Sequence, residues 1–548
     1  MINNHKNMDK SFILNGPEFA LQLPEGITMG QLIYNKLLSH GTKIAEIQNE
    51  TDEQLNFKQI LVQSCKLATY LKNNQVSVND RIAICSENNL NFCIPLCASA
   101  FIGATICPIN PTYKKKEFKH TLNISKPKYI FLSPFALKSI KHLIKELSWS
   151  PTLILIFGDA DENVPTIKML LKSKSLLNIE TFEVTKVEID KHIMGILCSS
   201  GTTGLPKGVK LTEKNYLKTV QNLLNPSTFF IQKNQILAHL LPFFHTYCFN
   251  TLIMGLIIGS TAIIFSHFDE EEFLTTIEKY KIEILTLVPP LMVFLAKHPM
   301  VQNYNLSFVK TIWCGAAPLS NEIEQAVKNR LQNAIIRQGY GMTELTFCVL
   351  IIPLESNKPG SAGKLISGIS AKIIPVNTNG EWSNKTLGPN EKGELCFKGD
   401  LVMLGYCGDA SATAATIDRD GWLHTGDIAY YDEDGFFYIV DRLKELIKYK
   451  GFQVAPAEIE TILLTHPEIK DAAVVGLLDE TAGELPFAFV VKQQNAKITT
   501  NDVVKYINDQ VSRHKRLHGG ARFIENIPKN LSGKILRREL RNLLNAKL

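Results

Sequence analysis

The sequence predicts an α/β protein with a large N-terminal domain of layered α/β sheets and a small C-terminal α+β domain. Its 548 residues are too many for one hydrophobic core. Apolar runs typical of buried strands alternate with stretches of helical periodicity, and this alternation favours largely parallel sheets covered by helices. Near residue 441 a strand-like run gives way to a short charged segment, where we place the domain boundary.

The N-terminal elements follow from local patterns of apolar residues. Continuous apolar runs predict buried strands, and apolar residues three and four positions apart predict helices. The longest apolar run, 251–265, is broken by glycines and is too short to cross a bilayer, so we expect a buried helix followed by a strand. The other predicted elements are strands at 81–85, 103–109, 129–132, 152–156 and 193–198, and helices at 57–73 and 269–280.

The boundary divides the chain into domains at 1–440 and 441–548. Proline is favoured in the first turn of a helix, so a helix is expected to begin at Pro456. About one hundred residues is an ordinary size for the smaller domain. The elements predicted around the boundary are a strand at 435–440, a loop or hairpin at 442–451, and strands at 472–476 and 487–491.

Charge and cysteine content limit the function classes. Lys and Arg number 59 against 53 Asp and Glu, a net charge of +6 that suits anionic substrates but is too weak to predict nucleic-acid binding. The 11 cysteines show neither paired nor zinc-type spacing, which predicts free thiols in a reducing compartment. The polar N-terminus lacks the apolar core of a signal peptide.

The C-terminal tripeptide Ala546-Lys547-Leu548 resembles the Ser-Lys-Leu peroxisomal address. A basic segment precedes it, which favours a free tail that an import receptor can read. We therefore expect a peroxisomal location. A frayed helix end, with a cytosolic protein, is the alternative.

Residues 199–208 carry the most specific signal in the chain. They read Ser-Ser-Gly-Thr-Thr-Gly-Leu-Pro-Lys-Gly and follow a predicted strand. Glycines let the backbone approach a ligand, hydroxyls and N–H groups line an anion site, and a lysine adds a point charge, so the segment predicts a polyphosphate loop. The lysine does not sit in a Walker A pattern, and an ordinary polar turn is the alternative. The residues assigned to phosphate are Ser199, Ser200, Gly201, Thr202, Thr203, Gly204 and Lys207.

Two further segments fit a nucleotide site. Gly315, Ala316, Ala317 and Pro318 follow a strand, and such small residues let a flat base lie against the backbone. In the run 337–344, two glycines flank an aromatic ring that can pack on an adenine or acyl group. Thr343 then offers a hydroxyl to phosphate, and Glu344 offers a hard oxygen to Mg²⁺. A glycine-rich turn that ends in a solvated acid is the alternative. The residues of this run are Gly339, Tyr340, Gly341, Thr343 and Glu344.

Two residues nearer the C-terminus complete the constellation. Asp427, in Trp-Leu-His-Thr-Gly-Asp, offers a carboxylate that can accept both hydroxyls of a ribose. Lys534 lies in a loop before a basic amphipathic tail. By itself it would be one surface lysine among many.

In order and spacing, these motifs resemble those of the adenylate-forming superfamily of acyl-CoA synthetases, 4-coumarate–CoA ligases and beetle luciferases. The resemblance covers essentially the whole chain and is strongest to insect luciferase-like fatty acyl-CoA synthetases. It implies a small β-barrel-like part in the large domain and a mobile C-terminal domain. It also implies that ATP and a carboxylic acid form an acyl-adenylate, which coenzyme A then attacks.

The resemblance also implies roles for individual residues. The 199–208 loop would hold the β- and γ-phosphates, Thr343 the α-phosphate, and Glu344 a Mg²⁺ ion. Lys534 would bridge the acyl carboxylate and the α-phosphate while charge builds up. The remaining implied contacts are Asp427 and Arg442 to the ribose and Gln453 near the nucleotide.

For thioester formation, the family's C-terminal domain rotates about the position of Asp441. This rotation would withdraw Lys534 and bring Lys448 and Gly451 to the coenzyme A channel. The acyl pocket implied by the resemblance comprises His245, Thr246, Phe249, Gly315, Gly341, Leu345 and Phe347.

The acid itself is less constrained. Thr219 falls where luciferases carry a luciferin-binding arginine, and Leu345 and Phe347 are bulkier than the luciferase residues. These departures favour an acyl-CoA synthetase for medium- or long-chain fatty acids. A luciferase that oxidises the adenylate with O₂ is the alternative within the enzyme class, and a non-catalytic acyl-nucleotide binder is the alternative outside it.

Overall fold

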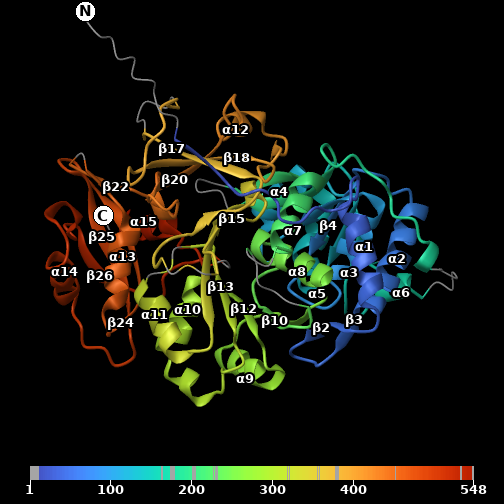
Figure 1. Cartoon of the computed structure of the whole chain (residues 1–548). Helices are drawn as coiled ribbons and strands as arrows, with labels where there is room; N and C mark the ends of the chain where they lie inside the picture. The colour runs from blue at the N-terminus through green and yellow to red at the C-terminus, as the bar shows by residue number, and fades with distance from the viewer. Residues whose placement is uncertain are drawn as a thin grey trace, which may run out of the picture.

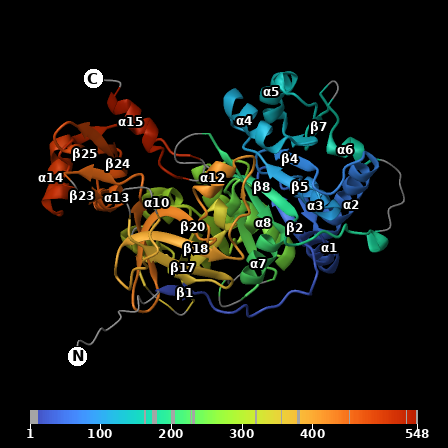
Figure 2. The same cartoon turned by 90° about the horizontal axis from the view of Figure 1, so that it is seen from above.

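The computed structural model describes residues 12–161, 164–172, 179–199, 205–225, 228, 233–317, 319, 321–354, 356, 358–376, 382–450, 452–530 and 533–545. Figure 1 shows the C-terminal elements gathered on one side, beside α10 and α11, and Figure 2 shows the same separation from above. In the part of the chain described, no helix is long and apolar enough to cross a membrane. Its elements form four sheets.

The first sheet contains β8, the strand that precedes the 199–208 loop. Its order is β19-β9-β8-β5-β4-β6-β7, and it is parallel from β7 to β8 and antiparallel beyond. The predicted strands are therefore present. The bounds are β4 Arg81–Cys85, β5 Thr105–Pro108, β6 Tyr129–Leu132, β7 Thr152–Leu155, β8 Ile193–Ser199, β9 Lys207–Thr212 and β19 Gly405–Tyr406, with α2 Phe57–Asn73, α3 Cys93–Ile102, α4 Lys115–Ser125, α5 Pro134–Leu143, α6 Ile167–Leu170 and α7 Glu213–Leu223.

The second sheet has the order β16-β15-β14-β13-β12-β10-β11-β2-β3 and is parallel from β2 to β14. The run 251–265 forms the end of α8 and then β11, as expected, and α8 packs against α1 in the core between the two sheets. The bounds are β2 Ile44–Gln48, β3 Gln54–Asn56, β10 Ile236–His239, β11 Thr261–Ile264, β12 Ile284–Leu287, β13 Thr311–Cys314, β14 Ile335–Gly341, β15 Cys348–Ile351 and β16 Lys364–Leu365, with α1 Met29–His40, α8 Thr246–Ile258, α9 Glu270–Tyr280, α10 Pro289–Lys297 and α11 Asn321–Arg330.

The third sheet is antiparallel, in the order β1-β17-β18-β20-β21. It is the all-β part expected within the large domain, and it lies above the other two sheets in Figure 1. Its strands β20 and β21 carry Asp427 and Arg442. The bounds are β1 Ile13–Asn15, β17 Ile369–Ile374, β18 Gly393–Gly399, β20 Leu423–Tyr431 and β21 Phe437–Arg442, with α12 Ala410–Ala414.

The C-terminal sheet has the order β23-β22-β25-β24, with β26 pairing parallel to β25. Its own core lies under α13 and α14. The hairpin of β22 and β23 overlaps the loop or hairpin predicted at 442–451 but extends further along the chain, and α13 begins at Pro456 as predicted. The division of domains at residue 441 stays a prediction. The bounds are β22 Ile447–Tyr449, β23 Phe452–Val454, β24 Ile469–Asp479, β25 Gly483–Lys492 and β26 Gly520–Phe523, with α13 Pro456–Thr465, α14 Thr500–Asn508 and α15 Arg537–Asn545.

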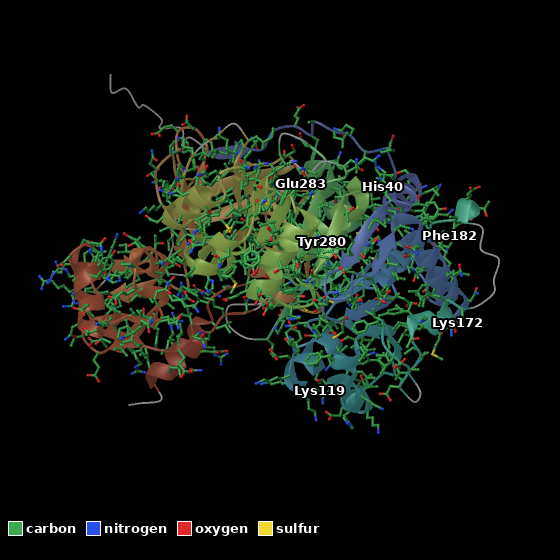
Figure 3. The ribbon with its side chains drawn as sticks, turned by 90° about the horizontal axis from the view of Figure 1, so that it is seen from below. His40, Lys119, Lys172, Phe182, Tyr280 and Glu283 are labelled. Atoms are coloured by element: carbon green, nitrogen blue, oxygen red, sulfur yellow. The ribbon has the colours of Figure 1, made fainter. Side chains whose placement is uncertain are left out.

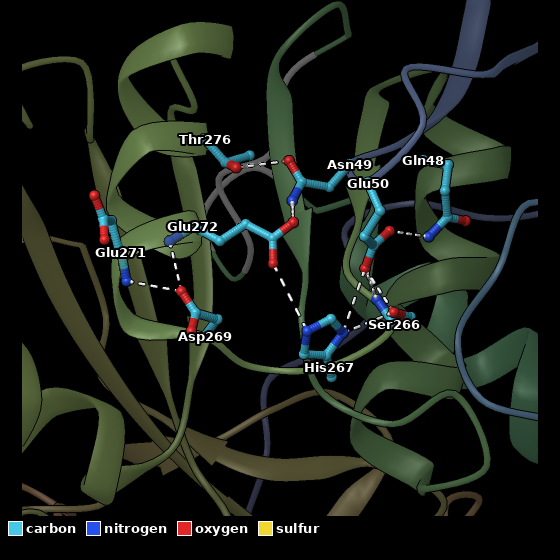
Figure 4. Close-up of polar contacts among 9 residues, drawn as sticks. All are labelled: Gln48, Asn49, Glu50, Ser266, His267, Asp269, Glu271, Glu272 and Thr276. Carbon is cyan, nitrogen blue, oxygen red and sulfur yellow. Dashed lines mark hydrogen bonds and ion pairs between the residues drawn. The ribbon is translucent and has the colours of Figure 1, made fainter.

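Capping side chains explain why helix bounds could be predicted. In α9, the Asp269 carboxylate accepts the N–H groups of Glu271 and Glu272 at 3.1 and 2.9 Å, which satisfies donors left over at a helix start. Figure 4 shows that the Glu272 carboxylate also accepts a hydrogen bond from Asn49, 2.7 Å away, which ties α9 to the end of β2. The helix predicted at 269–280 therefore begins one residue later, at Glu270.

Charged side chains form ion pairs on separate parts of the surface. Figure 3 places Lys119 and Lys172 on the N-terminal part, far from Glu283 on the middle part. Lys119 pairs with Glu146 at 3.2 Å, and Glu283 pairs with Lys310. The expectation that the chain does not bind nucleic acid stays a prediction.

Candidate active site

A cavity of about 380 Å³ lies where the sheets of the large domain meet the C-terminal elements. Strands β8, β13 and β14 end at it, and ligands in open α/β sheets bind at the carboxyl ends of strands. The structure thus brings together residues that the sequence separates by more than three hundred positions. The predicted residues lining the cavity are Ser199, Lys207, His245, Thr246, Gly315, Ala316, Gly339, Gly341, Thr343, Glu344, Phe347, Arg442 and Lys534.

Some predicted residues lie outside the described part of the chain, namely Ser200 to Gly204, Pro318, Gly451 and Ala546 to Leu548. Ser199 and Lys207, which flank the first of these segments, are cross-strand partners in β8 and β9, so both ends of the predicted phosphate loop reach the cavity. Ala317 follows Ala316 and is half-buried. The phosphate roles themselves stay predictions.

Glycine is required at Gly341 by close packing of the backbone. A Cβ atom there would lie 1.9 Å from the Phe347 carbonyl oxygen, a separation that no side chain tolerates. Gly341 pairs with Cys348 across the β14–β15 hairpin. The glycine therefore lets β15 approach β14 and brings Phe347 to the cavity wall.

Tyr340 packs beside Asp427, and its predicted contact with a base or acyl group stays a prediction. Its ring stacks on Phe397 with centroids 6.0 Å apart, and its hydroxyl donates a hydrogen bond to Asp427 Oδ2 over 2.5 Å. Tyr340 is not among the residues that line the cavity, whereas its neighbours Gly339 and Gly341 are, as expected where successive side chains of a strand point to opposite faces. Tyr340 supports the Asp427 carboxylate.

Asp427 and Arg442 are cross-strand partners in β20 and β21, and Arg442 Nε lies 3.4 Å from Asp427 Oδ1. Burial raises the pKa of Asp427, while Arg442 and the Tyr340 hydroxyl act in the opposite direction. A carboxylate held beside a guanidinium offers acceptors and donors to the two hydroxyls of a ribose. The predicted pair is therefore brought together.

Lys534 reaches this cavity from the C-terminal part of the chain. Its loop is closed by the Asn530 side chain, which accepts the Lys534 N–H over 2.9 Å, and by Gly533 in the left-handed region at φ 78°. Burial and then repulsion by Arg442 lower the pKa of Lys534 to about 8, although Glu445 and Asp427 favour the charged form. A desolvated cation beside Arg442 is poised to meet an anion.

Glu344 is buried in the short 3₁₀ helix Thr343–Leu345. Its Oε1 atom accepts a hydrogen bond from the Tyr406 hydroxyl over 2.9 Å, and Lys207 Nζ lies over the Tyr406 ring, 4.6 Å from its centroid. Tyr406 thus contacts both Glu344 and Lys207. Tyr406 was not predicted from the sequence, although Gly405-Tyr406 repeats the glycine–aromatic pattern of Gly339-Tyr340.

The predicted acyl pocket is partly corrected. Phe249 and Leu345 are fully buried in the hydrophobic core, where Phe249 packs on Tyr216 at a centroid distance of 6.2 Å, because α8 buries nearly its whole circumference. They are not placed on the cavity wall. The wall includes apolar residues that the sequence did not single out, namely Tyr247, Trp313, Met342 and Cys348.

His245 caps the start of α8, where its Nδ1 atom accepts the Tyr247 N–H over 3.4 Å. Burial lowers the pKa of His245 to about 4, so the ring is neutral at neutral pH. The neighbouring Thr246 hydroxyl donates to the Thr346 carbonyl oxygen, 2.6 Å away. His245 is therefore fitted to shape the pocket and accept hydrogen bonds rather than to supply positive charge.

Lys448 and Gln453 are placed away from the nucleotide cavity. They are cross-strand partners in the β22–β23 hairpin and line a second cavity, of about 590 Å³, together with Glu484 and Arg541. The Lys448 N–H donates to the Glu484 carboxylate at 2.8 Å. Leu443 and Lys444 line both cavities, so the two cavities adjoin, and the contact of Gln453 with the nucleotide stays a prediction.

Asp441 lies in β21 and is hydrogen-bonded to the C-terminal part of the chain. Its Oδ2 atom accepts the Ala457 N–H at 3.0 Å, near the start of α13. Burial raises the pKa of Asp441 to about 6, and Arg537 opposes this effect. A rotation of the chain at Asp441 would break this hydrogen bond to Ala457. The role of Asp441 as the hinge stays a prediction.

Two family descriptions match the chain. The AMP-binding enzyme family matches residues 36–407, and the AMP-binding enzyme C-terminal domain matches residues 458–534. Since the first match covers more than half of the chain, it decides the question of membership. The chain belongs to the AMP-binding enzyme family.

Relatives and solved structures agree with this assignment. The chain is 40% identical over 551 residues to luciferin 4-monooxygenase of Photuris pensylvanica, covering 98% of both proteins. It is 37% identical over 552 residues to the 4-coumarate–CoA ligase CCL1 of Humulus lupulus, again with 98% of both covered. The fold matches the crystal structure of an anthranilate CoA ligase in complex with anthranoyl-AMP, with a TM-score of 0.87, 21% identity and coverage of 96% of this chain and 98% of that one.

The predicted membership in the adenylate-forming superfamily and the layered α/β fold are thereby confirmed. The prediction of an AMP-forming ligase is confirmed at the level of the family. Because luciferin monooxygenases and CoA ligases are both similar to this AMP-binding enzyme, similarity leaves the acid open.

Proposed function

We propose that this AMP-binding enzyme is an ATP-dependent acyl-CoA synthetase for medium- or long-chain fatty acids. The observation that carries the proposal is one cavity lined both by the cations Lys207, Arg442 and Lys534 and by aromatic side chains. Cations suit the phosphates of ATP and a carboxylate. The apolar wall of Tyr247, Trp313 and Phe347 suits an alkyl chain.

In the first half-reaction the carboxylate attacks the α-phosphorus and pyrophosphate leaves. The residues of this chain act by position and charge: Asp427 and Arg442 orient the ribose, and Lys534 neutralises charge that builds up between the carboxylate and the α-phosphate. Lys207 and Ser199 face the leaving phosphates. These roles rest on the geometry of the cavity.

The surroundings of Glu344 fit a divalent cation. Its carboxylate is buried and held by Tyr406, beside Thr343 at the same cavity, and Mg²⁺ is usually bound through one or two carboxylates together with phosphate oxygens. Such an ion would neutralise phosphate charge. Glu344 would hold it.

In the second half-reaction, after a rotation of residues 441–548 about Asp441, the thiol of coenzyme A attacks the acyl carbonyl of the acyl-adenylate. The thioester forms as the bond from the carbonyl to the phosphate oxygen breaks and AMP leaves. The position of Lys448 in the second cavity supports this proposal, since the hairpin must travel to reach the adenylate.

We also propose peroxisomal import through the C-terminal Ala546-Lys547-Leu548.

Luciferin oxidation is the second candidate. It is favoured by the 40% identity to a luciferin 4-monooxygenase. Thr219, which stands at the position of a luciferin-binding arginine, lies buried in α7, where its hydroxyl donates to the Asn215 carbonyl oxygen at 2.9 Å. It offers no cation to a ligand.

A panel of carboxylic acids separates the two candidates. AMP formation is measured with and without coenzyme A for fatty acids of increasing length, 4-coumarate and luciferin, with light recorded for luciferin. We expect the largest coenzyme-A-dependent rate with a medium- or long-chain fatty acid. Light emission at the rate of beetle luciferases, with little fatty acyl-CoA formed, would refute the proposal.

The role of Lys534 is tested separately by Lys534→Ala, with Lys529→Ala as a control in the same segment. We expect pyrophosphate release to fall by a factor of about 10² to 10³ while ATP binding persists. Lys529 pairs with Asp471 at 2.6 Å and is expected to affect release little. Equal release by Lys534→Ala and the wild type would remove Lys534 from this step.

A further inference from the structure

A compact cluster of metal-binding side chains lies in the antiparallel sheet, beside the nucleotide cavity. Cys396 in β18 and His424 in β20 are cross-strand partners. His424 Nδ1 lies 3.5 Å from Cys396 Sγ and 3.3 Å from Glu394 Oε2. One donor atom from each of these three residues lies within 4.8 Å of the other two. The cluster is absent from the roles assigned above.

The second ring nitrogen of His424 is held in the way typical of a metal ligand. His424 Nε2 lies 3.4 Å from Asp418 Oδ2, and the Trp382 ring stacks on the imidazole at a centroid distance of 4.1 Å and an interplanar angle of 12°. Metal-binding histidines usually donate their other N–H group to a carboxylate, which fixes the tautomer and the ring. Here that arrangement leaves the Nδ1 lone pair facing Cys396 and Glu394.

We propose that Glu394, Cys396 and His424 form a site for zinc or a similar thiophilic divalent cation, with the fourth position open to the cavity. Tetrahedral zinc at usual bond lengths places nitrogen about 3.4 Å from oxygen and about 3.6 Å from sulfur. The observed separations of 3.3 and 3.5 Å lie within 0.1 Å of these values. The third separation, from Cys396 Sγ to a Glu394 carboxylate oxygen, lies within 4.8 Å.

The donor set separates this site from the one expected at Glu344. A thiolate and an imidazole select zinc over Mg²⁺, which prefers oxygen ligands. Binding forms a bond from the metal to sulfur and releases the thiol proton to the solvent. A thiolate, a carboxylate and a neutral imidazole then balance the double charge of the ion.

The location links the site to the nucleotide cavity. Glu394 and His424 line that cavity, and Glu394 Oε1 accepts the Gly426 N–H over 3.1 Å, one residue before Asp427. A bound ion therefore lies next to the ribose-binding carboxylate. Its open position faces the cavity, so water or a ligand in the cavity can complete its coordination.

Cobalt(II) titration of the full-length protein tests this proposal without any activity measurement. Co²⁺ takes tetrahedral sites and gives a near-ultraviolet charge-transfer band when bound to a thiolate. In the presence of a phosphine reductant, we expect one equivalent to bind with this band and Zn²⁺ to displace it. Excess Mg²⁺ should leave it unchanged.

Three variants assign the ligands. Cys396→Ser is expected to abolish the band and weaken binding more than about ten-fold, and Glu394→Gln to keep the band while weakening binding about ten-fold. Cys407→Ser, which changes a half-buried cysteine elsewhere in the chain, is the matched control and should bind like the wild type. The unfolding temperature of each variant shows that it is folded, and Glu394→Gln tests the site even where Cys396→Ser does not fold.

The proposal fails if the wild type gives no thiolate band, or if Cys396→Ser or Glu394→Gln binds Co²⁺ as the wild type does. It also fails if Cys407→Ser alone removes the band. Because the readout is metal binding, these outcomes are independent of which acid the enzyme activates.

Discussion

Replacing Arg537 by methionine is expected to loosen the C-terminal sheet and slow adenylation. The Arg537 guanidinium is buried, with only 8% of the residue exposed. Its Nε atom donates to Glu445 at 2.9 Å, and its Nη2 atom donates to Glu460 at 3.0 Å. Arg537 follows Lys534 by three residues and thereby connects the catalytic loop to α13 and to the segment after Asp441.

The magnitude follows from what the substitution leaves behind. Methionine fills much of the arginine volume but leaves two mostly buried carboxylates without their cation, and breaking a buried pair from one side costs about 3–5 kcal/mol. Glu460 keeps the Val474 N–H, which it accepts over 2.7 Å, so we expect the lower end, about 3 kcal/mol. This corresponds to a roughly hundred-fold increase in the opening equilibrium of the sheet.

Hydrogen exchange followed by mass spectrometry measures this opening in the full-length protein. Peptides from β24 and β25 should lose protection by the stated factor, whereas peptides from β4 and β5 in the large domain should not change. Arg538→Ala is the matched control, since Arg538 is the next residue in α15 and is exposed. In parallel, pyrophosphate release should fall at least ten-fold in Arg537→Met only.

Unchanged protection of β24 and β25 in Arg537→Met would refute the reasoning. An equal loss in Arg538→Ala would do the same, because it would assign the effect to α15 in general rather than to the buried ion pairs.

Three further predictions concern the nucleotide cavity. The charged form of Lys534 is lost as the pH rises through about 8, so kcat/KM for ATP should fall tenfold per pH unit above that value; a Lys534→Arg variant that keeps this limb would exclude the assignment. Gly341→Ala should abolish adenylation, measured as acid-dependent pyrophosphate release, because its Cβ would meet the Phe347 carbonyl oxygen at 1.9 Å; near-normal release would contradict the packing argument. Tyr340→Phe removes the hydrogen bond to Asp427 and should weaken ATP binding about five- to ten-fold, by about 1–1.5 kcal/mol, in a calorimetric titration; unchanged affinity would show that Asp427 needs no support.

Local patterns were sufficient wherever an element is specified by its own residues. The helix predicted at 57–73 is found with those bounds because Asn56 and Gln59 form a capping box at its start. The strand at 129–132 is likewise found as predicted, since a short apolar run in a parallel sheet is buried on both faces. Gly341 was predicted to lie at the site. The reason that glycine is needed there is the close approach of the Phe347 carbonyl group beside the next strand of the hairpin, which the local sequence does not show.

Side-chain direction was harder to predict than position along the chain. Tyr340 lies in the predicted motif, yet alternation along β14 turns its ring toward Phe397. The family resemblance assigned Phe249 to the acyl pocket, but α8 directs its side chain into the core. A sequence motif specifies which backbone reaches a site, whereas the sheet and helix packing around it specify which side chains face the ligand.

The sequence by itself determined the family, the sheets of the large domain and the backbone segments that meet at the cavity, because those depend on glycines, charged residues and apolar periodicity that are written locally. Only the tertiary structure showed that Lys534 and Lys448 lie at different cavities, that Tyr406 joins Glu344 to Lys207, and that Cys396 meets His424 across two strands. Each of these contacts joins segments far apart in the chain. The distances between these side chains depend on how the helices and strands pack, and the order of residues within one segment does not specify them.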